Sequence, residues 1–281
     1  MQNSIDREIQ AAKARPVIKW AGGKRQLIQR YKEYFPTRYN VYHEPFLGGG
    51  AVFFHLAPPV SYLSDSNEEL INMYRVIQNK VDQLIEDLSR HPNESDYYYR
   101  IRSLDVNSLN DVQRASRLIY LNRTCYNGLY RVNRKGLFNV PFGRYKRPKI
   151  LDIELLLAAS RALQRADLIR GDFGVVLENA RPGDFIYLDP PYHPVSSTAS
   201  FTDFTDQSFG ARDQERLAGI FDQLARRGCL VMLSNSDTPF VRELYQDYRR
   251  GIIPLTANRS INSKGDKRGP VGEIIVCNWI K

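Results

Sequence analysis

Long hydrophobic runs are missing from this 281-residue sequence. No stretch approaches the roughly 18 consecutive apolar residues that a membrane-spanning helix requires. The first residues, MQNSIDREIQAAKARP, are polar and contain acids, so they do not resemble the apolar core of a signal peptide. We therefore expect a cytoplasmic protein with no membrane partner.

Cysteine and histidine are scarce. The widely spaced cysteines, Cys125, Cys229 and Cys277, fit neither a disulfide framework nor a zinc site. The four histidines include no pair separated by four residues, the spacing that places two ligands on one face of a helix. We expect reduced structural thiols and no metal.

Acidic residues are absent from residues 114–149. This segment holds ten basic residues, whereas the rest of the chain holds 30 basic and 31 acidic residues, so the whole net charge of +9 arises here. Tyrosines are interleaved with the basic residues, a pattern typical of a surface that contacts phosphates. A solvated loop or an acidic protein partner would fit the charge alone, but the pattern favours nucleic acid.

Strand and helix patterns alternate over most of the chain, which favours an α/β fold with a mostly parallel sheet. Residues 94–125 have a helical pattern, and the following Asn-Gly, Lys-Gly and Phe-Gly turns are typical of a β-hairpin. Ser66 and Glu69 have the spacing of a capping box at the start of a long helix. The region from residue 67 to 148 interrupts the alternation, so we expect it to be an inserted domain.

In the sequence NVYHEPFLGGGAVFFHLA, a glycine turn lies between a predicted strand and a predicted helix. Such a turn lets the backbone approach a ligand closely, although it equally fits simple tight packing. Its spacing is not that of a dinucleotide or ATP-binding loop. Asp65, 17 residues after Gly48, ends the next predicted strand and suits a carboxylate that binds ribose hydroxyls. Together these features indicate a nucleoside cofactor without a polyphosphate.

The sequence FIYLDPPYHP, from Phe185 to Pro194, places a carboxylate and an aromatic ring on a rigid corner after a buried strand. The Asp189 side chain and the Pro190 carbonyl could accept both hydrogens of an exocyclic amine, which leaves its nitrogen lone pair able to attack an electrophilic methyl group. Tyr192 could stack on a base that has left the duplex. No cysteine follows a proline, which argues against methylation of a cytosine ring carbon.

Seven motifs follow one another along nearly the whole chain, from about Pro16 to Ile280. In order they are KWAGGK, EPFLGGGAVFF, LSDSNEELI, YLNRTCYNGLYRVNRKGLFNVPFGRYKRP, GDF, DPPYHP and LSNSDT. The chain thereby resembles the Dam-type (D12 class, alpha group) DNA adenine-N6 methyltransferases, and the hairpin block resembles the members that recognise GATC. The resemblance implies a Rossmann-like sheet that binds S-adenosylmethionine, formed by residues 1–66 and 149–281. It also implies an inserted helical and β-hairpin DNA-recognition domain at residues 67–148.

The resemblance also implies roles for individual residues. The catalytic tetrapeptide would be Asp189, Pro190, Pro191 and Tyr192. The cofactor would contact Trp20, Ala21, Gly22, Lys24, Pro45, Phe46, Gly48, Gly50, Asp65, Asp172, Phe173 and Asp189. The DNA would contact Lys19, Tyr126, Asn127, Leu129, Arg131, Asn133, Pro141, Arg144, Tyr145 and Lys146, with Tyr126 and Asn127 as the pair that wedges into the duplex.

The expected reaction is methyl transfer from S-adenosylmethionine to N6 of adenine in double-stranded GATC, with S-adenosylhomocysteine as product and the target adenine flipped into the DPPY pocket. Arginine can bind guanine O6 and N7 together, and leucine or proline can contact a thymine methyl group. A monomer or weak dimer is expected. A restriction endonuclease that acts separately is a partner the sequence leaves open.

Two other readings remain. The first keeps the enzyme class but changes the substrate to RNA, another DNA sequence or the amide nitrogen of a glutamine. The basic hairpin argues against the amide, and the intact NGLYRVN and VPFGRY argue against RNA. The second is a DNA-binding regulator without turnover, against which the intact Asp65, Asp172 and DPPY argue. We assign no role to residues 91–113 or 259–269.

Overall fold

The computed structural model describes residues 13–23, 28–194, 209–258 and 270–280. Lys24 and the segment 259–269 lie outside the described residues. The strands are β1 Tyr42–Glu44, β2 Ser61–Asp65, β3 Ala166–Arg170, β4 Phe185–Leu188, β5 Leu230–Ser236, β6 Ile252–Asn258 and β7 Pro270–Cys277. The helices are α2 Ile28–Tyr31, α3 Ala51–Leu56, α4 Glu68–Asn79, α5 Val81–Leu88, α6 Ser95–Ser103, α7 Asp111–Thr124, α8 Ile153–Leu163, α9 Val176–Asn179, α10 Ala211–Arg226 and α11 Pro239–Leu244. Short 3₁₀ helices occur at Val106–Ser108, Tyr126–Gly128, Phe173–Val175 and Gln246–Gly251.

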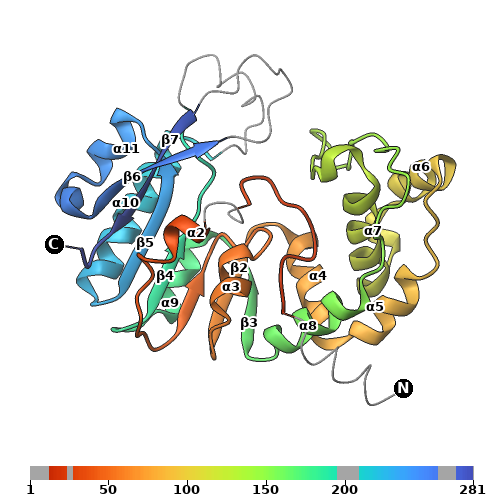
Figure 1. Cartoon of the computed structure of the whole chain (residues 1–281), viewed down its shortest axis with the longest axis horizontal. Helices are drawn as coiled ribbons and strands as arrows, with labels where there is room; N and C mark the ends of the chain where they lie inside the picture. The colour runs from red at the N-terminus through yellow and green to blue at the C-terminus, as the bar shows by residue number, and fades with distance from the viewer. Residues whose placement is uncertain (1–12, 24–27, 195–208, 259–269, 281) are drawn as a thin grey trace. The chain divides into compact units, whose positions relative to one another are not determined.

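The seven strands form one sheet in the order β3-β2-β1-β4-β5-β7-β6 (Figure 1). β1 pairs in parallel with β2 and β4, and β4 pairs in parallel with β5. β7 is antiparallel to both β5 and β6. The mixed α/β architecture confirms the Rossmann-like fold class. The strand order reverses at β1, between β2 and β4, and such switch points are where open α/β sheets bind ligands at the carboxyl ends of their strands.

Two compact units divide the described chain. Unit 1 comprises Met1–Arg25, Leu47–Pro59 and Ser64–Gly171, and unit 2 comprises Gln26–Phe46, Val60–Leu63 and Asp172–Lys281. These units are defined by which residues pack together. The predicted catalytic and recognition domains are defined by function, and that division stays a prediction.

Unit 2 is built around a continuous apolar core. β4 is buried at every position, and its residues Ile186 and Leu188 pack with Leu217 and Phe221 of α10. The core extends to residues of α9, β5, α11 and β7. Strands covered by helices in this way read as unbroken apolar runs, which explains the sequence FIYL immediately before Asp189.

Unit 1 packs α4, α5, α7 and α8 together. Asn67 caps α4 by accepting from the Leu70 amide, so the predicted capping box at Ser66 and Glu69 is wrong by one residue. The helical pattern predicted over residues 94–125 is confirmed, and it is divided into two helices, α6 and α7, with a short 3₁₀ helix between them. Asn110 and Gln113 form a capping box that starts α7 afresh.

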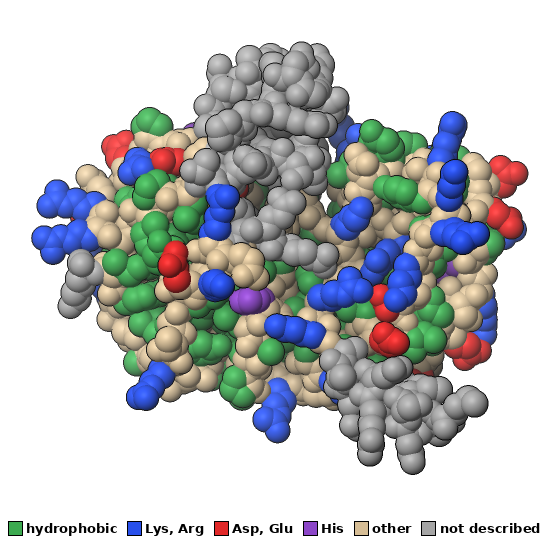
Figure 2. All heavy atoms as spheres, in the orientation of Figure 1, with side chains coloured by type: hydrophobic (Ala, Val, Ile, Leu, Met, Phe, Trp, Pro, Cys, Tyr) green, Lys and Arg blue, Asp and Glu red, His purple; other side chains and the backbone are tan. Residues whose placement is uncertain are grey.

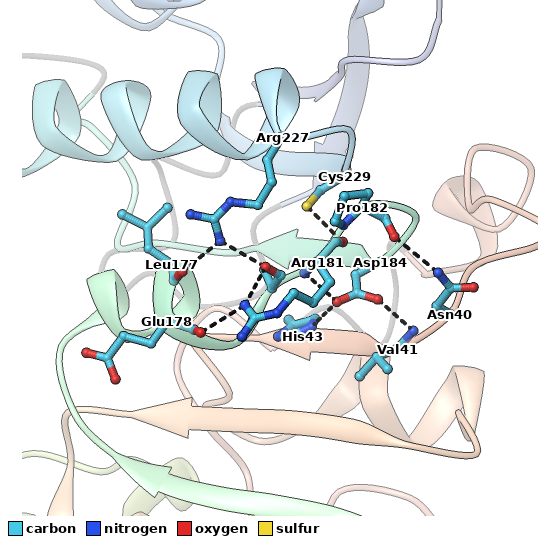
Figure 3. A network of polar contacts seen from close by, with 11 residues as sticks. Asn40, Val41, His43, Leu177, Glu178, Arg181, Pro182, Asp184, Arg227 and Cys229 are labelled. Atoms are coloured by element: carbon cyan, nitrogen blue, oxygen red, sulfur yellow. Dashed lines mark hydrogen bonds and ion pairs between the residues drawn. The ribbon is translucent and has the colours of Figure 1, made fainter.

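A buried polar network lies at the amino-terminal ends of β1 and β4 (Figure 3). The Nε2 atom of His43 lies 3.0 Å from the Asp184 carboxylate, which also accepts from the amides of Val41 and Arg181. Burial lowers the pKa of His43 below its usual range, and the hydrogen bond to Asp184 opposes this. The folded protein therefore favours the neutral imidazole.

This network predicts a pH-dependent stability. An unfolded histidine binds a proton near pH 6.5, whereas folded His43 binds one only at lower pH, so the unfolded state holds more protons as the pH falls below about 6.5. We expect the free energy of unfolding to decrease over that window. Urea unfolding of the wild type and His43→Gln at several pH values measures this, and His55→Gln, at a less buried histidine, is the control. An equal pH dependence in the wild type and His43→Gln would exclude His43 as the cause.

Candidate functional site

The glycine turn of unit 1 is held by Asp65. Asp65 Oδ2 accepts from the Gly48 amide at 2.9 Å, and Oδ1 accepts from the Asn67 amide at 2.9 Å. Burial raises the pKa of Asp65, and these backbone donors oppose the shift. The sequence predicted a carboxylate at the end of β2, but its hold on the turn itself was not foreseen.

Aromatic rings surround the same turn. A side chain at Gly48, whose φ is +49°, would place its Cβ 2.9 Å from the indole of Trp20, so only glycine permits this approach. Trp20 also stacks on Tyr130 with ring centroids 4.7 Å apart. The Tyr74 hydroxyl donates to the Gly48 carbonyl. Ala21 and Gly22 are exposed beside Trp20, and Gly50 begins α3 with a φ of +67°.

A second aromatic group belongs to unit 2. Phe46, which follows Pro45 after β1, stacks on Phe173 with centroids 5.2 Å apart, and Phe209 packs against both. The guanidinium of Arg216 lies 3.8 Å from the centroid of the Phe173 ring. Phe46, Phe173 and Phe209 therefore form one aromatic cluster, and a contact of Phe173 with the cofactor stays a prediction.

Arg216 also pairs with Asp172. Its two terminal nitrogens donate to the two carboxylate oxygens at 2.7 and 2.6 Å. This hydrogen bonding lowers the pKa of Asp172. Asp172 Oδ1 also accepts from the Gly174 amide, so an incoming amino group would have to share these oxygens. No motif in the sequence points to Arg216.

The DPPY corner directly follows β4 in unit 2. The Ser234 hydroxyl donates to Asp189 Oδ1 at 2.8 Å. Pro190 is buried, Pro191 is exposed, and Asp189 and Tyr192 are partly buried. Burial raises the pKa of Tyr192 well above its usual value, with the Asp189 charge adding to the effect. The tyrosine hydroxyl therefore stays protonated.

The predicted hairpin is present in unit 1. Its two sides are joined by backbone bonds from Asn139 to Arg131, from Tyr126 to Pro141 and from Gly143 to Thr124. The Asn133 side chain accepts from the amides of Lys135 and Leu137, so Asn133 shapes the turn. Arg131 donates from Nε to Asn139 Oδ1 at 2.7 Å, which orients its guanidinium.

Asn122 connects the hairpin to the KWAGGK segment. Its buried amide accepts from the Lys19 amide at 2.8 Å and donates to the carbonyls of Lys19 and Gly128. A Cβ at Gly128 would lie 2.5 Å from the Lys19 side chain. Lys19 is therefore fixed beside the Tyr126–Gly128 turn. The motif YLNR contains this asparagine, but sequence reasoning assigned it no role.

The basic residues between positions 114 and 149 differ in how far their side chains are exposed. Arg117 is only 8 % exposed and donates to the carbonyls of Ile101 and Arg102, while Arg114 pairs with Glu68 and Glu69. The exposed members all follow residue 130: Arg131, Arg134, Lys135, Arg144, Lys146, Arg147 and Lys149. Figure 2 shows basic side chains on the surface over α5, α6 and α7, interspersed with acids. The ten basic residues counted in this segment therefore overstate the positive charge that its surface exposes.

Side chains of helix α6, and of Asn93 just before it, hold the backbone of the hairpin. Tyr98 and Arg102 both donate to the Val140 carbonyl, and Asn93 donates to the Tyr145 carbonyl. The region from residue 91 to 103, to which the sequence assigned no role, therefore holds the returning side of the hairpin.

Comparison with known proteins identifies the family to which the chain belongs. Residues 20–261 match the model of the D12 class N6 adenine-specific DNA methyltransferases. The chain belongs to this family. It is 45% identical over 273 residues to the type II methyltransferase M1.LlaDCHI of Lactococcus lactis subsp. cremoris, covering 94% of this chain and 95% of that protein. It is 42% identical over 288 residues to the type II methyltransferase M.MjaIII of Methanocaldococcus jannaschii (94% and 99%), and 37% identical over 268 residues to a DNA adenine methylase of Vibrio cholerae (94% and 95%).

This D12-class methyltransferase acts on the N6 atom of adenine in DNA, and its family implies S-adenosylmethionine as methyl donor. Among the described residues, no group of three or more histidine, cysteine or acidic side chains could hold a metal ion. The described helices include none long and apolar enough to cross a membrane. The three cysteines are buried, and burial raises the pKa of Cys125 to about 11, so this thiol is protonated at neutral pH.

Proposed function

We propose that this methyltransferase modifies adenine N6 in double-stranded 5′-GATC-3′ and releases S-adenosylhomocysteine. The hairpin carries the proposal. It presents Arg131, Pro141 and Tyr145 as exposed side chains on a backbone that α6 supports, and Asn122 holds Lys19 beside it. These positions match those at which GATC-recognising members of the family contact bases.

The side-chain chemistry supports this readout. Arg131 would bind O6 and N7 of a guanine with its terminal nitrogens, because Asn139 already holds its Nε. Leu129 and Pro141 would contact the thymine methyl group, and Lys19 and Tyr145 would contact the remaining bases. Arg144 and Lys146 are exposed and would bind phosphates, which sets the register of the protein on the duplex.

Base flipping is part of the proposal. Tyr126 is 54% exposed, and the neighbouring Asn127 has a φ of +56°, a conformation that asparagine tolerates better than most residues. An exposed aromatic ring on such a fixed turn suits insertion into the duplex, where it would replace the stacking that the target adenine loses.

The residues predicted to bind the cofactor fit S-adenosylmethionine in their chemistry. Asp65 would accept from the ribose hydroxyls, and the glycine turn would give close backbone access. Phe46 and Phe173 would pack against the adenine ring, and Asp172 would accept from its amino group. Trp20, Ala21, Gly22, Lys24 and Pro45 would complete the contacts by their match to the family.

Catalysis would depend on positioning. When bound, S-adenosylmethionine supplies an electrophilic methyl group on its sulfur. Asp189 and the Pro190 carbonyl would accept the two amine hydrogens of the target adenine, so that its N6 lone pair points at the methyl carbon. The N6–C bond would form as the S–C bond of the donor breaks, and the proton that N6 loses would pass to solvent. Tyr192 would stack on the flipped base, with Pro191 keeping the corner rigid.

The proposal also covers the domain organisation of the chain. Residues 67–148 would form the inserted recognition domain, and residues 1–66 and 149–281 the catalytic domain. The enzyme would act as a monomer or weak dimer. Two of the relatives are named type II methyltransferases, which supports a separately acting restriction endonuclease as a partner.

The test is methyl transfer from labelled S-adenosylmethionine to two duplexes, one with a single GATC and one with those bases scrambled, followed by separation of the nucleosides. Label in N6-methyldeoxyadenosine from the GATC duplex only is the expected result. Equal label in both duplexes would reject the proposed sequence preference. Duplex binding without any label would favour the regulator without turnover.

Lys146 gives a separate prediction about phosphate contacts. We expect Lys146→Ala to weaken binding to all duplexes alike and to reduce the slope of log K against log salt by about 1, since one fewer counterion is released. Lys149→Ala is the matched control, because Lys149 is paired with Asp152 at 2.9 Å and should change the slope less. A loss confined to GATC duplexes would contradict a phosphate role.

A further inference from the structure

We infer that Ser234 is a positioning residue that fixes the orientation and the ionised state of the Asp189 carboxylate. The inference rests on the proposed catalytic role of Asp189. Ser234 lies on β5 and is fully buried, with 0% of its surface exposed. Its hydroxyl donates to Asp189 Oδ1 at 2.8 Å.

A second hydroxyl sets the direction of this hydrogen bond. The Tyr187 hydroxyl lies 3.1 Å from the Ser234 hydroxyl, and either oxygen could donate on geometry alone. An ionised carboxylate only accepts, so the single hydrogen of Ser234 goes to Asp189. Tyr187 then donates to Ser234, and the Tyr192 hydroxyl is a further hydrogen-bonding neighbour of Ser234. The chain of donors runs from Tyr187 through Ser234 to Asp189, and each bond polarises the next.

This arrangement orients the Asp189 carboxylate. Oδ1 accepts from Ser234, which holds the rotation of the carboxylate plane. In the proposed reaction the carboxylate, held in this plane, would accept an amine hydrogen of the target adenine. A carboxylate that receives a hydrogen bond in its charged form has a lower pKa than one without it, so Ser234 also keeps Asp189 an acceptor as the pH falls.

The neighbours of Ser234 hold the backbone of the same corner. Asn235 accepts from the His193 amide at 3.2 Å, and the Ser236 hydroxyl donates to the His193 carbonyl at 2.6 Å. Gln214 donates to the Pro191 carbonyl at 2.9 Å and is itself bound by Asn235. These contacts fix the corner without touching the carboxylate. Loss of the Ser234 hydroxyl should therefore disturb Asp189 while the backbone stays in place.

Among the described residues, the charge of Asp189 acts on three buried tyrosines. Tyr42 on β1, Tyr187 on β4 and Tyr192 on the corner all have pKa values raised by burial, and the Asp189 charge adds to each shift. Glu44 bonds to Tyr42, and the charge of Glu273 on β7 acts on Tyr192. All three tyrosines are neutral throughout the working pH range. The three tyrosines therefore do not contribute to the acid limb of the pH–rate profile, and the comparison of Ser234→Ala with the wild type isolates the part that depends on the Ser234 hydroxyl.

The test is Ser234→Ala, measured as single-turnover methyl transfer at saturating DNA and cofactor from about pH 5 to about pH 9. We expect the rate to fall roughly ten- to hundredfold, as for other residues that orient a reactive group. The acid limb should move to higher pH, while the KM values for DNA and S-adenosylmethionine stay within about twofold. Ser61→Ala is the matched control, a buried serine whose hydroxyl has no partner among the described residues, and it should behave as the wild type.

A wild-type rate for Ser234→Ala, or a reduced rate with an unmoved acid limb, would overturn the inference. If Ser234→Ala fails to fold, Ser234→Cys keeps a weak donor of similar size and should give a smaller shift in the same direction. Asp189→Ala separates this outcome from failure of the proposed function. An active Asp189→Ala enzyme would refute the catalytic role itself, whereas an inactive one beside a normal Ser234→Ala enzyme would refute only the role of Ser234.

Discussion

Asp189→Ala is expected to abolish methyl transfer while leaving the fold intact. The substitution removes the acceptor that would hold one amine hydrogen of adenine, and the Pro190 carbonyl alone would hold only the other, which no longer favours the geometry in which the N6 lone pair can attack. Loss of one positioned group of this kind typically costs a factor of about 100 to 1000 in rate. Removal of the carboxylate also leaves the buried Ser234 hydroxyl without its acceptor, but Asp189 is itself only partly buried, so the stability cost should be small.

Single-turnover transfer to a GATC duplex measures this effect, with urea unfolding to confirm the fold. Asp189→Asn is the informative companion variant, because it keeps the shape but presents a weaker, neutral acceptor. We expect Asn to retain more activity than Ala and less than the wild type. Undiminished activity in Asp189→Ala would remove Asp189 from the reaction.

Arg131→Ala is expected to relax the preference at one base pair of the site by on the order of 1–3 kcal/mol, the cost of losing a bidentate contact to guanine. The guanidinium is exposed, and its Nε is held by Asn139, so its terminal nitrogens have a defined direction. Arg131→Lys should lose most of the same discrimination, since an ammonium group cannot reproduce the planar pair of donors.

The measurement is methyl transfer to duplexes substituted singly at each position of GATC. Lys135→Ala is the matched control, a cation on the turn of the same hairpin without a predicted base contact, and it should weaken all substrates alike. An unchanged preference at every position in Arg131→Ala would exclude Arg131 from base recognition.

Local patterns predicted much of the fold. The apolar run before Asp189, the glycine turn after β1 and the carboxylate ending β2 all follow rules of strand and turn chemistry, and each was placed correctly. The hairpin followed from its glycine turns. The helix cap predicted at Ser66 lies one residue too early, because Ser66 and Asn67 are both favoured capping residues and the spacing to Glu69 alone does not choose between them.

Contacts between distant residues could not be predicted in the same way. Ser234 lies 45 residues from Asp189, and Asn122 lies 103 residues from Lys19. Serine and asparagine occur in many settings, so neither carries a signal of its own. The charge count failed for a related reason, since a sequence does not distinguish Arg117, buried against backbone carbonyls, from the exposed Arg131.

The support of the hairpin by α6 has a consequence for how sequence preference can change. Tyr98, Arg102 and Asn93 all donate to main-chain carbonyls of the hairpin, and the ring of Tyr98 packs on Phe142, which is not among the predicted base contacts. None of these contacts depends on the identity of residues 129, 131 and 141. Such a scaffold would let the side chains proposed to read bases be exchanged one at a time without refolding the loop, which makes these positions the natural ones to randomise in selecting variants for new target sites.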